Sequence, residues 1–143
     1  MQNTKSKIAN GEFNDWEDES QRFDMIKLVR EGISYDDFLV FFKNIPFTEK
    51  EWADYLGIST RTLDRYRNGS KNFPPKQSER IIEIKRLLDF GENVFGDHDN
   101  FMAWMSMQNI AMGGVVPKKL LDTTIGINMV YDQIGRIEHG VLA

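Results

Sequence analysis

Polar residues suited to binding nucleic acid are concentrated between positions 59 and 76 of this sequence. Arginine and lysine side chains bind phosphate oxygens, and hydroxyl, amide and carboxylate side chains hydrogen-bond to the base edges of the major groove. Several of these residues recur at spacings of three or four, which places them on one face of a helix. They are Ser59, Thr60, Arg61, Asp64, Arg65, Asn68, Lys71 and Lys76.

The elements that must position these side chains are two short helices around a glycine turn. Thr48 and Glu51 have the spacing of a capping box, in which a hydroxyl and a carboxylate accept hydrogen bonds from backbone amides. We expect a first helix that ends at Gly57 and a second over residues 60–68. This pattern predicts a helix-turn-helix core at residues 48–68, whose second helix is the recognition helix. A helical hairpin whose arginines only solvate a surface is the alternative.

The formal net charge of −4 is opposite in sign to that expected of a protein that binds DNA. The charges are segregated, however, because acidic residues crowd positions 12–19 while cations gather in and after the predicted recognition helix. Salt screens charges that are more than about 10 Å apart, so a local patch governs contact with phosphates. The cations of this part of the sequence are Arg61, Arg65, Arg67, Lys71, Lys76, Arg80, Lys85 and Arg86.

Other chemistries have little support in the sequence. With no cysteine and two histidines, it offers no thiolate metal site, no disulfide and no nucleophile–base pair at a recognised spacing. Asp97, His98 and Asp99 are potential metal ligands, but such a turn more often caps a helix. Gly113-Gly114 lacks the strand and lysine of a phosphate-binding loop, and no apolar run reaches the roughly 18 residues of a membrane span. We therefore expect a soluble, cytoplasmic protein that is not an enzyme and uses no metal or cofactor.

Apolar periodicity predicts an all-α fold. Residues 1–11 are polar and lack periodicity, so a disordered tail is expected there. Residues 12–95 are predicted to form N-terminal helices and a helix-turn-helix domain, ending with a long connecting helix over about residues 76–95. Residues 96–143 are predicted to form a small C-terminal helical domain.

Two predicted helices carry apolar faces whose partners the sequence leaves open. The face of the helix over residues 14–31 is expected to pack on the domain or on a second subunit, and it comprises Trp16, Phe23, Ile26 and Val29. The last helix has a narrow apolar seam suited to a core or to a partner's groove, formed by Ile127, Val130, Ile134, Ile137 and Val141.

Two blocks of the C-terminal half resemble a known family. AMGGVVPKKLLDTTIG at 111–126 and IGRIEHGVLA at 134–143 are similar to the C-terminal toxin-binding domain of Xre/MbcA/ParS antitoxins, which an Xre-like helix-turn-helix usually precedes. The resemblance covers about residues 32–143. The sequence departs from the family pattern at Gln108-Asn109, where Pro-Asn is common, and at Leu142, where an aromatic is frequent. The most specific matches are Gly113, Gly114, Pro117, Leu121, Asp122 and Thr123, then Gly135, Arg136, Ile137, Glu138, His139 and Gly140.

The resemblance implies an antitoxin of a type II toxin-antitoxin pair. Its partner would be a RES-domain toxin that attacks cellular NAD, and the chain would act as a homodimer that represses its own operon by binding operator DNA. The toxin-binding residues expected from it are Ile134, Arg136, Ile137, Glu138, His139 and Val141.

Three alternatives remain open at this point. The polar residues near the C-terminus either enter the toxin's NAD site or form intramolecular contacts that hold the last helical turn. The chain as a whole is otherwise a stand-alone transcriptional regulator whose C-terminal half is a dimerisation domain. The third alternative is an antitoxin whose helix-turn-helix has lost DNA binding and serves only as a scaffold.

Overall fold

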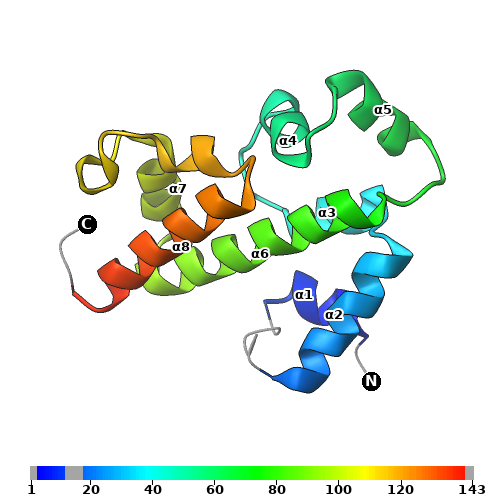
Figure 1. Cartoon of the computed structure of the whole chain (residues 1–143), viewed down its shortest axis with the longest axis horizontal. Coiled ribbons are helices and arrows are strands. Elements are labelled where there is room, and N and C mark those ends of the chain that lie inside the picture. The colour runs from blue at the N-terminus through cyan, green and yellow to red at the C-terminus, as the bar shows by residue number, and fades with distance from the viewer. Residues whose placement is uncertain (1–2, 12–17, 141–143) are drawn as a thin grey trace. The chain divides into compact units, whose positions relative to one another are not determined.

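The computed structural model describes residues 3–11 and 18–140, and these residues form helices connected by turns and loops (Figure 1). The prediction of an all-α fold is confirmed, since no strand occurs within the described ranges. The elements are α1 (Thr4–Ala9), α2 (Glu19–Glu31), α3 (Tyr35–Phe41), α4 (Glu49–Leu56), α5 (Thr60–Asn68), α6 (Pro75–Phe95), α7 (His98–Ser106), the 3-10 helices η1 (Ile110–Met112) and η2 (Pro117–Leu120), and α8 (Thr124–Glu138).

The chain divides into two compact units, residues 1–85 and 86–143. The first unit contains α1 to α5 and the N-terminal part of α6, and the second contains the rest of α6 with α7, the two 3-10 helices and α8. The division falls inside α6, whereas the sequence analysis placed the boundary at its C-terminal end, between residues 95 and 96.

Local signals define the two helices of the helix-turn-helix. The hydroxyl of Thr48 accepts from the amide of Glu51 at 3.1 Å, and the carboxylate of Glu51 accepts from the amide of Thr48 at 3.0 Å, so the predicted capping box is formed. Gly57 ends α4 in the left-handed conformation with φ 68°, which costs glycine no Cβ penalty. The second helix, α5, has the predicted bounds.

An aromatic cluster forms the core of the first unit. Phe38 of α3 packs edge to face on Trp52 of α4 and on Phe73, which precedes α6, with ring centroids 4.9 and 5.7 Å apart. All three side chains are buried, as are Ala53 and Leu63 at the junction of α4 and α5. The helix-turn-helix therefore rests on α3 and on the segment before α6.

The N-terminal region differs from its prediction. The structure places Thr4–Ala9 in a helix where the sequence analysis expected a disordered tail, because Ile8 is buried and Lys5 pairs with Asp37 of α3 at 3.1 Å. A helix of six residues is too short to show an apolar period, so its packing was invisible in the sequence.

The predicted apolar face of α2 does not pack fully on its own unit, and packing on a second subunit was the other alternative. Met25 and Leu28 are buried, while Phe23 and Ile26 are 62% and 45% exposed. Trp16, which was expected to continue that face, lies outside the described residues.

In the second unit, the core forms where α6, α7, η2 and α8 meet. Phe101, Met105, Leu121, Val130 and Ile134 are fully buried there. Gly91 of α6 allows close approach: a Cβ added to it would lie 1.9 Å from Cζ of Phe101. The ring of Phe101 thus occupies the space that any other residue at position 91 would need.

Two mid-helix glycines should respond oppositely to alanine. We expect Gly91→Ala to destabilise the protein by about 2 kcal/mol, since an overpacking cost of about 3 kcal/mol exceeds a helix-propensity gain of about 1 kcal/mol. The matched control is Gly135→Ala in α8, where no atom lies within 4 Å of the added Cβ, and it should stabilise by about 0.5–1 kcal/mol. Denaturant unfolding measures both changes, and equal effects of the two substitutions would contradict the packing argument.

Candidate nucleic-acid and protein interfaces

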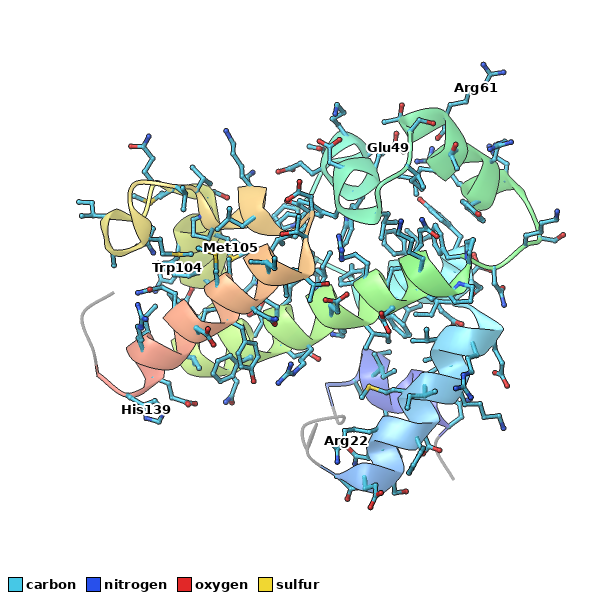
Figure 2. The ribbon with its side chains drawn as sticks, viewed as in Figure 1. Arg22, Glu49, Arg61, Trp104, Met105 and His139 are labelled. Carbon is cyan, nitrogen blue, oxygen red and sulfur yellow. The ribbon has the colours of Figure 1, made fainter. Side chains whose placement is uncertain are left out.

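The recognition helix α5 presents a cationic face to solvent. It buries Leu63, while Thr60, Arg61, Arg65 and Asn68 are exposed. Figure 2 shows Arg61 pointing away from the helix-turn-helix into solvent. The helix therefore exposes most of the side chains that the sequence analysis assigned to DNA.

Some of the predicted DNA-contacting residues already have local partners. The hydroxyl of Ser59 caps α5 by accepting from the amide of Thr62 at 3.0 Å, and it also bonds to the Thr62 hydroxyl. The guanidinium of Arg65 donates to the same Thr62 hydroxyl at 3.4 Å. Asp64 forms an ion pair with Arg67 at 3.2 Å. These contacts order the helix, and Ser59 and Asp64 are consequently weaker candidates for base contact than their sequence positions suggested.

Lys71 and Lys76 extend the exposed cationic surface beyond α5. Lys71 lies in the loop that follows α5, and Lys76 lies in the first turn of α6. Both are exposed, and neither they nor Arg61 form an ion pair with any residue in the described ranges. Their charges are thus available for phosphates.

The remaining cations of this sequence region do not belong to one patch. Arg80 donates to the carbonyl of Tyr55 at 2.8 Å and pairs with Glu83 at 3.5 Å, and Lys85 is buried. Arg86, in the second unit, lies over the ring of Tyr131 at 4.5 Å from its centroid. The sequence cluster therefore overstates the number of cations that face solvent next to α5.

Residues of α8 divide between a buried and an exposed face. Thr123 caps the helix by accepting from the amide of Gly126 at 2.9 Å. Ile127, Val130 and Ile134 of the predicted seam are buried. Ile134 therefore departs from its prediction as a toxin contact, because its side chain belongs to the core of the second unit.

The exposed face of α8 forms a continuous stripe. Because a helix advances by about 100° per residue, five exposed residues fall within an arc of about 80°, opposite the buried seam. We call this set the α8 stripe, and its members are Ile125, Met129, Asp132, Arg136 and His139. Figure 2 places His139 at the C-terminal end of α8.

Two members of the α8 stripe were missed by the sequence analysis. Ile125 and Met129 are 76% and 48% exposed, although both are large and apolar. Their spacing of four on the side opposite to the predicted seam was the signal that could have identified them. Ile125 and Met129 are neighbours on one helix face and form a small exposed apolar patch.

The polar residues near the C-terminus do not form a single cluster. Arg136 donates to the side chain of Gln133 at 3.2 Å, and the carboxylate of Glu138 lies 3.8 Å from Nε2 of His139. Ile137 is half-buried, and neither it nor Glu138 belongs to the α8 stripe. Val141 lies outside the described residues. Of the predicted toxin-binding residues that the structure describes, only Arg136 and His139 therefore share the exposed stripe.

A tight loop presents a further apolar residue. Asn109 is buried and closes the loop through its backbone amide, which donates to the backbone carbonyl of Val115 at 2.8 Å. Gly113 and Gly114 both have positive φ and lie in the turn of this loop. Ile110, which follows Asn109, is 94% exposed.

The potential metal ligands after α6 act as helix caps and hydrogen-bonding groups. Asp97 caps α7 by accepting from the amide of Asn100 at 2.9 Å, and Nδ1 of His98 lies 2.5 Å from the carboxylate of Glu92. No group of three potential ligands occurs in the described part of the chain. Within the same residues, every helix is too short or too polar to span a bilayer.

Two family models match the regions of the chain that contain α5 and α8. A family model for the antitoxin Xre-like helix-turn-helix domain matches residues 24–86, which include α5. A second model, for the antitoxin Xre/MbcA/ParS C-terminal toxin-binding domain, matches residues 91–140, which include α8. These matches confirm the resemblance noted in the sequence.

Curated relatives cover most of the same region. Antitoxin Xre of Yersinia enterocolitica is 35% identical over 83% of this chain and 81% of its own length. Antitoxin Xre of Photorhabdus laumondii is 36% identical over 61% of this chain and 60% of its own. The Prs ADP-ribosylating antitoxin of a Sphingobium species is 26% identical over 84% of this chain and 81% of its own.

Proposed function

We propose that this chain, which belongs to the Xre antitoxin family, keeps a RES-domain toxin inactive and represses its own operon through α5. The family establishes an antitoxin with a DNA-binding helix-turn-helix, and the RES toxin and the operon are the proposed partners. The observation that carries the proposal is the match of residues 91–140 to a toxin-binding domain whose last helix exposes the α8 stripe.

The α8 stripe supplies both apolar area and charge for toxin binding. Ile125 and Met129 are suited to the buried centre of an interface, where large apolar side chains contribute most. Arg136 follows on the same face and has no ion pair with a described residue. An arginine in the toxin's NAD site would pair with acidic groups or occupy the place of a substrate phosphate, and so exclude NAD. The chain thus acts by binding, in the cytoplasm where NAD and operator DNA are found, and needs no catalytic group of its own.

Met129→Lys should release the toxin. Burying a lysine in the interface without a partner is expected to weaken toxin binding by roughly 10- to 100-fold. NAD consumption by the toxin, measured against antitoxin concentration, reports the change. Because one relative is named for ADP-ribosylation, transfer of ADP-ribose is measured in parallel.

The matched control for this substitution is Val40→Lys in α3, where the wild-type side chain is 55% exposed in the first unit. It makes the same charge change outside the toxin-binding domain and should leave neutralisation intact. Equal loss in both variants would contradict the role of the α8 stripe. Binding of operator DNA by a chain that copurifies with no toxin would instead favour a stand-alone regulator.

Operator binding by α5 should depend on Arg61 and on salt. Each phosphate neutralised adds about 0.9 to the slope of log affinity against log salt, so Arg61→Ala should weaken binding and reduce the slope by about 0.9. Arg22→Ala, on α2, makes the same charge change on a part of the first unit far from Arg61 (Figure 2) and should change neither quantity. Fluorescence anisotropy with the chain's own upstream DNA measures both, and a salt-independent affinity would show that the helix-turn-helix is only a scaffold.

We further propose that α2 contributes to the homodimer. Glu19, Phe23, Ile26 and Arg30 are exposed and fall within an arc of about 60°. In an antiparallel pair of α2 helices around a two-fold axis, Phe23 lies opposite Ile26 of the second copy and Glu19 lies opposite Arg30. The face is therefore complementary to itself, as an isologous interface requires. Two copies would bind operator half-sites about one helical turn apart.

Charge reversal tests this pairing. Glu19→Arg and Arg30→Glu should each lower the dimer affinity, because each places like charges opposite one another. The double variant restores opposite charges and should recover the dimer. Sedimentation velocity over a concentration series measures the three outcomes, and a double variant weaker than both single variants would contradict the pairing.

A further inference from the structure

Arg67 differs from the other arginines of α5 in having several partners of its own. Its Nη2 group forms an ion pair with the carboxylate of Glu49, and Nη1 lies 3.2 Å from the carboxylate of Asp64. Its Nε group donates to the hydroxyl of Tyr35 at 3.2 Å, and the guanidinium lies over the same ring at 5.8 Å from the centroid. By contrast, Arg61 has no ion pair with any described residue, and Arg65 has one hydrogen bond to Thr62.

The partners of Arg67 come from three helices. Glu49 is the first residue of α4, Tyr35 is the first residue of α3, and Asp64 precedes Arg67 by one turn of α5. The dipole of α4 favours the negative charge of Glu49 in its first turn, and the dipole of α5 favours the positive charge of Arg67 in its last turn. Arg67 thereby ties the C-terminal end of α5 to the beginnings of two neighbouring helices.

The C-terminal end of α5 depends on few other attachments. At its N-terminal end, α5 is joined to α4 by the short turn after Gly57, and Leu63 buries its middle. Beyond Asn68 the chain continues through four exposed residues, Gly69 to Asn72, and the side chain of Asn72 donates to the carbonyls of Glu31 and Gly32 at 3.4 and 3.2 Å. Tyr66 packs on Phe73 with ring centroids 4.7 Å apart. The ion pairs and hydrogen bond of Arg67 are the polar contacts that hold the same end of the helix.

We propose that Arg67 is a positioning residue that orients the recognition helix and does not neutralise a DNA phosphate. The inference rests on the proposed DNA binding by α5. Two carboxylates compensate its charge, and its Nε, Nη1 and Nη2 atoms are all engaged by residues of the same unit. The cations of α5 that contact phosphates are then Arg61 and Arg65, which the geometry leaves facing solvent.

A positioning role and a phosphate contact make opposite predictions for Glu49→Gln. If Arg67 bound a phosphate, removing its carboxylate partner would free the guanidinium and strengthen operator binding. If Arg67 positions α5, the same substitution loosens the helix and weakens binding. We expect Glu49→Gln and Arg67→Ala each to weaken operator binding by about 3- to 10-fold, consistent with the small contribution of exposed ion pairs.

The salt dependence of operator binding provides the second discriminating measurement. Full-length wild type, Arg67→Ala, Glu49→Gln and Arg61→Ala are titrated with the chain's own upstream DNA over a series of salt concentrations. Arg67→Ala should keep the wild-type slope, whereas Arg61→Ala should lose about 0.9 from it. A slope reduced by about 0.9 in Arg67→Ala, or tighter binding by Glu49→Gln, would overturn the proposal.

Hydrogen exchange of the free protein tests the same inference without DNA. Amides in the last turn of α5 should exchange faster in Arg67→Ala and Glu49→Gln than in wild type, while those of α8 stay unchanged and show that the variants are folded. Unchanged exchange in α5 would overturn the positioning role even for a chain that binds no operator. Failure of wild type to bind DNA, with faster exchange in the variants, would instead reject the proposed operator function and retain the tie between the helices.

Discussion

Burial of the aromatic cluster around Phe38 is the interaction on which the helix-turn-helix depends. The helices α4 and α5 have eight and nine residues, fewer than the roughly 12–15 that an isolated helix needs to be marginally stable in water. Trp52 and Phe73 pack edge to face on Phe38, and burying each ring contributes about 2–3 kcal/mol. The short helices therefore persist because their inner faces are buried against the rest of the first unit. The packing of the inner face of α5 also determines which of its residues face solvent.

Burial of one helix face likewise divides α8 of the second unit into a buried and an exposed side. Burying Ile127, Val130 and Ile134 in the core directs the opposite face of the helix to solvent. Ile125 and Met129 become exposed as a result, on the same side as Arg136. Apolar residues on that side contribute nothing to the core of the unit, and the proposed toxin contact uses this exposed apolar area.

Charge behaves less simply than the sequence suggests. An acidic protein can present a cationic helix because contact with phosphate is governed by charges within about a Debye length. A cation in the sequence is nevertheless not always a cation at the surface. Arg80 hydrogen-bonds to a backbone carbonyl of α4, and Arg67 is paired with two carboxylates, so neither presents an uncompensated charge beside α5.

The sequence by itself determined the elements of the helix-turn-helix and the family. The capping box at Thr48, the left-handed Gly57 and the cap at Ser59 are contacts between residues no more than four apart, so they are readable in order along the chain. Only the tertiary structure decided which side chains those elements leave available. Tyr35 meets Arg67 across 32 positions, and Ile8 is buried because α1 packs against α3. Such contacts depend on how helices meet in space, and no local period or spacing encodes that.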